Sequence, residues 1–364
     1  HLQFIGLIAF EDVLKPTAKA TLERARALNV QLKILTGDSP EVAGATAHAA
    51  GLVRDPCDVI TGSALEELSY EKRRRVVRER AVFARVSPRQ KYDIIKLLQE
   101  TSEVGFLGEG INDAPALKLA NVAMVVSGAS DIARESADVV LLQKNLETIV
   151  DGIREGRAIF ANILKYLKIT LASNFGNFYS VAMASLFLPF VPLLPIQILL
   201  LNLLSDFPML ALATDRVEAR ELERPKQYDV RSVVLIATLL GAVSSAFDFM
   251  LFGIFFRAAP ETLRTAWFLL SILTEVALIY SLRSKLPFFR AGKPSFWLAL
   301  LSGLAVGVAM VLPFTFIGRE WFHFAMPTAE FSLIIGALLL GYFIATEIVK
   351  RWYHRHIVES VRER

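Results

Sequence analysis

The sequence predicts an α/β domain followed by an all-α transmembrane domain of six helices, and the contrast between the two halves of the chain supports this prediction. Residues 1–158 carry most of the charge and alternate short apolar runs with amphipathic stretches, a pattern typical of βαβ units. From Ile159 onward long apolar segments dominate. The hydrophobic fraction of 54% and the mean hydropathy of +0.44 exceed those of an ordinary soluble enzyme and indicate a second half that lies in lipid.

Residues 108–117 form the most informative segment of the first half. The run Gly-Glu-Gly-Ile-Asn-Asp-Ala-Pro-Ala-Leu brings two carboxylates, an amide and two glycines to one turn. The turn lies between a predicted buried strand at 103–107 and a helix with Pro115 in its first turn. Because open α/β sheets bind ligands at the carboxyl ends of their strands, the segment predicts a site for a magnesium ion and a phosphoryl group.

This segment resembles the hinge signature of P-type cation-transporting ATPases, Gly-Asp-Gly-x-Asn-Asp-x-Pro-Ala-Leu, and only Glu109 departs from it. Two further family signatures stand in the same order: Thr36-Gly37-Asp38 after a predicted strand at 30–35, and the run Arg-Val-Ser-Pro-Arg-Gln-Lys at 85–91. The resemblance covers the family's carboxyl-terminal portion. It implies a haloacid dehalogenase-like, Rossmann-type phosphorylation domain joined by a continuous stalk helix to six membrane helices.

The resemblance also implies roles for individual side chains. Thr36 would hydrogen-bond the phosphoryl oxygens, and Lys91 would neutralise their charge. Glu109 and Asp113 would hold Mg²⁺ at the phosphoryl site, while Asn112 and Asp113 would orient the loop and the phosphate.

Gly37 and Asp38 would contact ATP when the nucleotide domain closes, and Asp38 is expected to cap a helix that begins at Ser39. The alternative readings are a strand-end cap for Thr36, a solvated helix lysine for Lys91 and a turn-forming Asn-Asp pair at 112–113. The joint occurrence of the three signatures in family order favours the phosphoryl site.

The membrane half divides at its charged segments into apolar stretches near the ~20 residues that cross a bilayer. The predicted spans are 162–187, 192–213, 232–256, 265–282, 295–317 and 331–349. With residues 1–158 in the cytosol, six crossings return the tail, 354–364, to the cytosol; fourteen Lys and Arg in the cytosolic segments against three in the outer loops support this orientation. We therefore expect a transmembrane domain at 159–353, and the resemblance implies a bacterial or archaeal plasma membrane.

Polar side chains inside these spans predict an ion path. Asn174 and Asn177 are three residues apart on one helical face, and Asn202 and Asp206 are four apart near two prolines that can free backbone carbonyls. These oxygens suit a hard cation, and they resemble the ion-binding pattern of calcium-type and magnesium-type pumps. Asn177 stands where calcium pumps have a glutamate, which makes a calcium site of their kind doubtful.

Two more carboxylates lie within predicted spans. Glu275 matches a glutamate of the calcium-type pumps, with a direct ion role and helix–helix hydrogen bonding as equally open readings. Asp248 resembles a feature of the bacterial magnesium-translocating branch, and a structural role is favoured for it.

The sequence thus indicates part of an ATP-driven cation pump, with Mg²⁺ or another divalent cation as the expected cargo. The Asp-Lys-Thr-Gly-Thr loop of the family is absent from the sequence, and a strand is predicted at 4–10, so a missing amino-terminal portion of the same protein is an expected partner together with the lipid bilayer. Cys57 is the single cysteine of the sequence, so an intrachain disulfide is excluded. The grouping of Lys and Arg in loops argues against nucleic-acid binding. The alternatives are a non-pumping membrane regulator or passive ion path, and a membrane-tethered phosphatase.

Overall fold

The chain forms two compact units that meet between Glu155 and Gly156, in a computed structural model that describes residues 3, 5, 14–143 and 145–358. The predicted strand at 4–10 lies almost wholly outside the described residues, as does the end of the predicted tail, 359–364. Each unit has its own hydrophobic cores.

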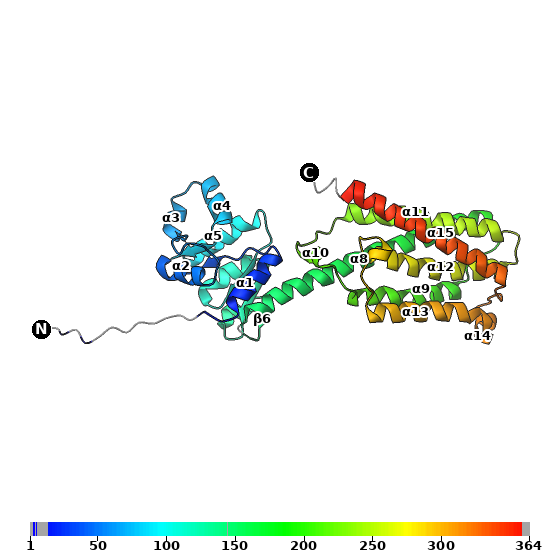
Figure 1. Cartoon of the computed structure of the whole chain (residues 1–364), viewed down its shortest axis with the longest axis horizontal. Coiled ribbons are helices and arrows are strands. Elements are labelled where there is room, and N and C mark those ends of the chain that lie inside the picture. The colour runs from blue at the N-terminus through cyan, green and yellow to red at the C-terminus, as the bar shows by residue number, and fades with distance from the viewer. Residues whose placement is uncertain (1–2, 4, 6–13, 144, 359–364) are drawn as a thin grey trace. The chain divides into compact units, whose positions relative to one another are not determined.

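The first unit is an α/β structure with two parallel three-stranded sheets (Figure 1). In the first sheet the order is β1-β3-β2, and in the second it is β4-β5-β6. The strands are β1 (Ile34–Leu35), β2 (Ile60–Thr61), β3 (Val82–Ala84), β4 (Gly105–Gly108), β5 (Val122–Val126) and β6 (Val139–Leu141). The predicted strands at 30–35 and 103–107 therefore exist, but β1 is shorter and β4 lies slightly further along the chain.

A short helix, α1, precedes the first strand, and further short helices connect the strands, as βαβ units require. They are α1 (Ala18–Ala27), α2 (Pro40–Ala49), α3 (Gly62–Glu66), α4 (Tyr70–Glu79), α5 (Pro88–Gln99), η1 (Ile111–Asp113), α6 (Ala114–Leu119) and α7 (Asp131–Glu135). Phe83 and Ile94 are fully buried in the core beside the first sheet, and Val125 and Leu117 occupy the core of the second. β1 and β4 are each an edge strand of their sheet.

Two helix starts show how the local sequence sets the loops of this unit. The α5 helix begins with a capping box, in which Ser87 and Gln90 satisfy each other's backbone N–H groups, and Pro88 occupies its first turn. The predicted cap of α2 by Asp38 is wrong: the Ser39 hydroxyl accepts the Val42 N–H, because the Asp38 carboxylate is already bonded to the preceding turn.

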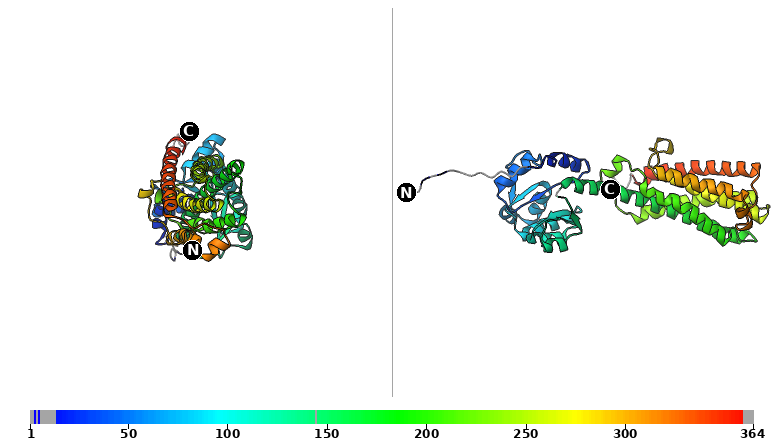
Figure 2. Two further views of the ribbon diagram at one scale, coloured as in Figure 1. Left: turned by 90° about the vertical axis from the view of Figure 1, so that its right-hand side faces the viewer. Right: turned by 90° about the horizontal axis from the view of Figure 1, so that it is seen from below.

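The second unit is helical, and its long helices run alongside one another (Figures 1 and 2). The α-helices are α8 (Leu146–Phe187), whose first ten residues belong to the first unit, α9 (Pro195–Ala211), α10 (Ala219–Leu222), α11 (Val230–Phe255), α12 (Pro260–Leu282), α13 (Phe296–Val311), α14 (Phe316–Glu320) and α15 (Ala329–Tyr353). Short turns extend or link them: η2 (Leu212–Thr214), η3 (Phe288–Arg290), η4 (Leu312–Phe314) and η5 (His354–Val358).

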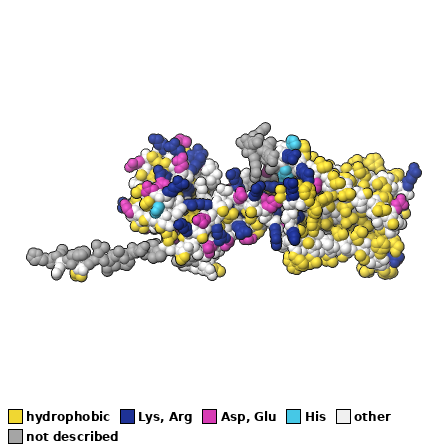
Figure 3. All heavy atoms as spheres, in the orientation of Figure 1, with side chains coloured by type: hydrophobic (Ala, Val, Ile, Leu, Met, Phe, Trp, Pro, Cys, Tyr) yellow, Lys and Arg dark blue, Asp and Glu magenta, His cyan; other side chains and the backbone are white. Residues whose placement is uncertain are grey.

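Five helices among the described residues are long and apolar enough to cross a membrane: Pro195–Thr214, Val230–Phe255, Pro260–Leu282, Phe296–Phe314 and Ala329–His356. Hydrophobic side chains gather over the surface of this unit (Figure 3). The predicted span at 162–187 is the carboxyl-terminal part of α8 and does not reach the same hydropathy, because Asn174, Asn177 and several hydroxyl side chains interrupt it. The second unit is therefore a multi-pass membrane structure with five candidate spans.

Candidate functional site

An ion pair joins the two sheets of the first unit at the predicted phosphoryl site. Lys91 on α5 follows the first sheet, and Asp113 lies in η1 after β4 of the second. The Lys91 Nζ is 2.7 Å from the Asp113 Oδ1, and the two side chains are only 16% and 13% exposed. A cation and a carboxylate that enter from different sheets are thus held together near the carboxyl end of β4.

Asp113 also fixes the loop that precedes it. Its Oδ2 accepts the backbone N–H groups of Glu109 and Gly110, each at 3.3 Å. Burial raises the pKa of the Asp113 carboxyl, but the hydrogen bond and charge of Lys91 and these two N–H groups outweigh it, so the pKa lies below its ordinary value. Both carboxylate oxygens therefore have partners inside the protein, which makes Asp113 an anchor of the loop.

Gly108 is required by this close packing. A Cβ at Gly108 would lie 2.8 Å from the Asp113 Cβ and 3.1 Å from the Phe106 Cε1, closer than side chains tolerate. The Glu109 carbonyl accepts the Ser130 N–H at 3.0 Å, which ties the loop on its other side. The backbone is thereby held while the Glu109 side chain is exposed.

The Thr36-Gly37-Asp38 turn is organised around one hydroxyl. The Thr36 Oγ1 donates to the Asp38 Oδ2 at 2.7 Å and accepts the Asp38 N–H at 3.2 Å. The Arg85 N–H donates to the Asp38 carbonyl at 3.0 Å, and Arg85 takes a left-handed conformation with φ of 48°. This turn is thus fixed against the end of β3, and the described hydrogen bonds do not link its side chains to Asp113 or to Asn112, which is exposed in η1.

The chemistry of these donors accommodates a magnesium ion only in part. Among the described residues no group of three or more His, Cys, Asp or Glu side chains could by itself hold a metal ion. Glu109 has an exposed side chain at the end of β4, and the Asp113 oxygens are engaged by Lys91 and two N–H groups. Oxygen ligands from bound phosphate, water or another segment would have to complete an octahedral site.

In the helical unit, Glu275 is the polar centre that the sequence only partly predicted. Its Oε1 accepts the Ser173 hydroxyl at 2.6 Å and the Asn177 Nδ2 at 2.9 Å, both from α8. Ser205 and Asp206 of α9 are near enough to interact with the same carboxyl group. Three helices therefore meet at this side chain, which is 6% exposed. Ser173 and Asn177 are four residues apart on one face of α8, a spacing that could have identified the serine.

The other predicted cation ligands have exposed side chains. Asn202 and Asp206 lie one turn apart on α9, and Asn174 lies on α8. Pro208 inside α9 cannot donate to the carbonyl of residue 204, which leaves a backbone oxygen without its helical partner next to these groups. The structure thus brings Asn177, Asp206 and Glu275 to one region, while Asn174 and Asn202 make no side-chain hydrogen bond to the described residues.

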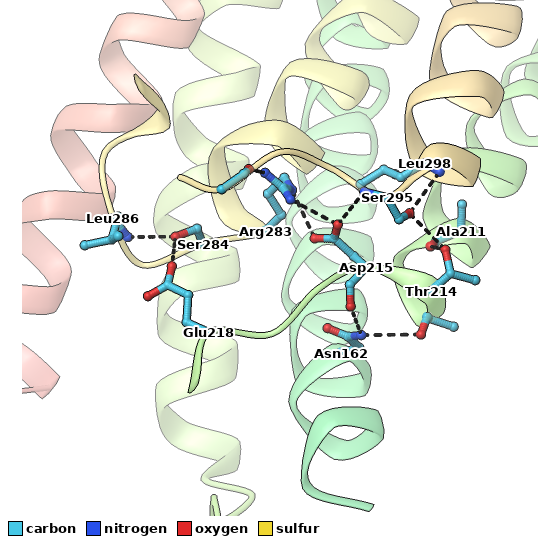
Figure 4. Close-up of polar contacts among 12 residues, drawn as sticks. Asn162, Ala211, Thr214, Asp215, Glu218, Arg283, Ser284, Leu286, Ser295 and Leu298 are labelled. Atoms are coloured by element: carbon cyan, nitrogen blue, oxygen red, sulfur yellow. Dashed lines mark hydrogen bonds and ion pairs between the residues drawn. The ribbon is translucent and has the colours of Figure 1, made fainter. Parts of the chain in front are cut away.

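Sequence reasoning missed a buried ion pair at one end of the helical unit (Figure 4). The Arg283 Nε and Nη2 each lie 3.0 Å from an oxygen of Asp215, whose side chain is fully buried. The Asn162 Nδ2 of α8 donates to the Asp215 carbonyl at 2.8 Å, and the Ser295 N–H donates to its carboxylate at 3.0 Å. Arg283 is one of the fourteen Lys and Arg in the predicted cytosolic segments, and nothing in the local sequence marks its partner 68 residues away.

Comparison with known proteins finds two family profiles in this chain. Residues 1–121 match the profile described as haloacid dehalogenase-like hydrolase, and residues 190–352 match that described as cation transporting ATPase, C-terminus. A Salmonella typhimurium protein named magnesium-transporting ATPase, P-type 1, is 40% identical over 361 residues, 96% of this chain and 39% of the relative. The Escherichia coli K12 protein of the same name is 37% identical, over 96% of this chain and 40% of the relative.

A more distant relative is the calcium-transporting ATPase of Bacillus subtilis, which is 32% identical over 94% of this chain and 40% of the relative. The chain spans about 40% of the length of these curated relatives.

Proposed function

From the premise that this chain belongs to the P-type cation-transporting ATPases and corresponds to their carboxyl-terminal portion, we propose that the whole protein is an ATP-driven pump that forms an aspartyl phosphate. This chain spans 39% of the length of the Salmonella typhimurium relative. The nucleophilic aspartate and most of the ATP-binding surface would come from the part of the protein outside this chain. Residues 1–158 would supply the remainder of the phosphorylation domain.

The Lys91–Asp113 pair is the observation that carries this proposal. Phosphoryl transfer needs fixed positive charge and positioning more than covalent chemistry from the protein. Lys91 is held by Asp113 at 2.7 Å, where it would neutralise a phosphoryl oxygen, and the Thr36 hydroxyl would donate to another. Glu109 would coordinate Mg²⁺, with Asp113 holding the loop that presents it. Magnesium would neutralise phosphoryl charge when bound.

A divalent cation, with Mg²⁺ as the first choice, is the proposed cargo. Two relatives named as magnesium-transporting ATPases match nearly the whole chain, and Asn177, Asp206 and Glu275 provide oxygens at one region of the helical unit. Asn174 and Asn202 would complete the ligand set, because exposed amides on membrane helices need a polar partner in place of lipid.

The same proposal sets the membrane topology. The carboxyl-terminal part of α8 would be a sixth span, since its amides face a cation path. Six crossings place residues 1–158 and the carboxyl terminus on the cytosolic side of a bacterial or archaeal plasma membrane, in agreement with the bias of Lys and Arg.

The test uses the full-length protein in proteoliposomes that contain a magnesium-sensitive dye. ATP should drive Mg²⁺ movement, and Asp206→Asn should lower that movement at least tenfold while phosphorylation by inorganic phosphate persists, because the substitution leaves the Lys91 site intact. Glu109→Ala should abolish phosphorylation instead. The control is Glu261→Gln, an exposed carboxylate in the first turn of α12, which should change neither.

Other outcomes would identify the alternatives. A magnesium flux without ATP as large as the flux with ATP would establish a passive path. Hydrolysis of phosphate monoesters with no ATP-dependent phosphoenzyme would establish a tethered phosphatase.

A further inference from the structure

An open apolar groove lies on the helical unit between α13 and α15, which both pack on α12. The groove has a volume of about 350 Å³ and is lined only by apolar residues, among them Ala277 of α12, Val306 of α13, and Leu339 and Phe343 of α15. Water is poorly held by apolar cavities, whereas hydrocarbon fits them. On a unit with five candidate membrane spans, the groove is therefore suited to a hydrocarbon chain.

Gly336 of α15 keeps the groove open. A Cβ at this position would meet no atom of another described element within 4 Å, and Leu340, one turn further along the groove, is 62% exposed. Gly341 on the same helix differs, because a Cβ there would lie 3.0 Å from the Phe247 ring of α11. Glycine is unfavourable inside a helix unless a close contact requires it. The contact at Gly341 is within the protein, whereas the space beside Gly336 is left for another molecule.

Aromatic side chains extend the groove toward the carboxyl end of α15. Phe343, at that end of the groove, packs edge to face on Phe288 of η3, with ring centres 5.2 Å apart. Phe289, the next residue of η3, is 72% exposed, and the Arg351 guanidinium carbon lies 5.8 Å from the centre of its ring. Exposed apolar surface beside membrane helices indicates contact with lipid. An apolar path thus leads from the groove to a cation.

The charge of Arg351 is not neutralised by the acidic residue nearest to it on α15. Glu347, four residues earlier, accepts hydrogen bonds from the Lys350 ammonium at 2.6 Å and the Ser281 hydroxyl at 2.7 Å through one oxygen, and from the Phe288 N–H at 3.2 Å through the other. Arg351 is exposed and forms no ion pair with the described residues. An arginine fork can bind a phosphate through two parallel hydrogen bonds, so this guanidinium suits the headgroup of a phospholipid.

The spacing between the groove and the cation matches one leaflet of a bilayer. Positions 336, 340, 343, 347 and 351 follow one another at intervals of three or four, so Arg351 continues the face of α15 that lines the groove. From Gly336 to Arg351 the helix rises about 22 Å. Half of a bilayer, headgroups included, is about 20–22 Å thick. A phospholipid with its phosphate at Arg351 would therefore reach Gly336 with the end of its acyl chain.

We propose that the helical unit binds a phospholipid of net negative charge, with one acyl chain in the groove between α13 and α15 and the phosphate on the Arg351 guanidinium. Phe288 and Phe289 contact the chain between these two points. The charge of Arg351 makes the site selective for an anionic headgroup over a zwitterionic one. The inference uses only the helical unit and its membrane spans, and it holds whether or not the protein is a pump.

Native mass spectrometry of the full-length protein tests the site, after release from nanodiscs with equal amounts of phosphatidylglycerol and phosphatidylcholine. The parent should retain one phosphatidylglycerol molecule in preference to phosphatidylcholine. Gly336→Leu should lower this retention by about fivefold or more, because the new side chain occupies the groove and has room there. Gly303→Leu is the matched control: this exposed glycine of α13 is equally open but does not line the groove, so retention should not change.

Arg351→Gln separates the headgroup contact from the groove. The substitution should lower the retention of phosphatidylglycerol about fivefold and leave that of phosphatidylcholine unchanged, as expected for the loss of one cation at a lipid headgroup. Equal retention of the two lipids by the parent, or parental retention in either Gly336→Leu or Arg351→Gln, would overturn the proposal.

Photo-cross-linking identifies the occupant in the cell membrane. A benzophenone side chain in place of Leu340, which lines the groove, should yield an adduct with a phospholipid. Cross-links to a second copy of this chain or to another protein, or the absence of a lipid adduct, would contradict a lipid site. None of these measurements needs ATP or a transported cation, so their outcome is independent of the pump proposal.

Discussion

Removal of the Arg283 guanidinium should destabilise the helical unit strongly, because its partner would remain buried. Arg283 makes a two-pronged contact with Asp215 at 3.0 Å and donates to the Gly292 carbonyl at 2.6 Å. The Asp215 side chain has no exposed surface, and after the substitution the Ser295 N–H would be its remaining described donor. Breaking a buried pair on one side costs about 3–5 kcal/mol, and we expect Arg283→Met to lie in this range.

The assay is reversible unfolding of the full-length protein in mixed micelles, followed by tryptophan fluorescence. The matched control is Arg283→Met combined with Asp215→Leu, which removes both charges and should recover most of the loss, since apolar replacement of a whole buried pair is often neutral. The reasoning is refuted if the single variant loses less than about 1 kcal/mol, or if the double variant is the less stable of the two.

Two further predictions concern the Lys91–Asp113 ion pair and the packing of α8 on α11. Lys91→Met should destabilise the first unit by about 1–2 kcal/mol near neutral pH. The pKa of Asp113 is lowered in the folded state, so ionised Asp113 stabilises the fold fully above its ordinary pKa near 3.9, and this contribution is lost as the pH falls through the folded-state pKa. The free energies of unfolding of the parent and of Lys91→Met should therefore become equal in acid. Measurement of the unfolding midpoint as a function of pH tests this. Gly241→Ala should lower the free energy of unfolding by about 1–3 kcal/mol, because the new Cβ would lie 2.9 Å from the Phe175 Cβ. Gly253→Ala on the same helix is the control and should be neutral or stabilising, because no atom lies within 4 Å of its Cβ position. Equal shifts of the melting temperature for the two variants would contradict the close contact.

Local sequence predicted the backbone of residues 108–115 well. Gly108, Asp113 and Pro115 specify a strand end, a turn and a helix start through their own backbone preferences, and the structure has each of them. The Asp38 cap was predicted wrongly because Ser39 is an equally good capping residue and the Thr36 hydroxyl binds the carboxylate first. Propensity alone does not decide such competition between adjacent side chains.

Tertiary partners were beyond local reasoning. The hydrophobic pattern predicted six spans, and five of them are candidate spans among the described residues. It could not show that Ser180 faces Asp248 or that Ser173 faces Glu275, since these pairs are 68 and 102 residues apart. The helical periodicity of the polar side chains on α8 was visible in the sequence, yet it marks only a face and not the helix that covers it. Division of the α/β sequence into two separate sheets likewise depends on pairing between strands.

In the proposed pump, the exposure of the side chains around Glu275 predicts the route by which the cation reaches it. Glu275 is buried between α8 and α12, whereas Asn202 and Asp206 on neighbouring α9 have exposed side chains. Lipid cannot satisfy an amide or a carboxylate, so in the membrane this face of α9 needs a polar cover from water or from another segment of the protein. A cation that enters along that face would meet Asp206 first and Glu275 behind it. In the proposed pump the exposed carboxylate is therefore expected to govern cation affinity, so Asp206→Asn should raise the Mg²⁺ concentration needed for half-maximal transport in proteoliposomes, and an unchanged concentration would contradict this entry route.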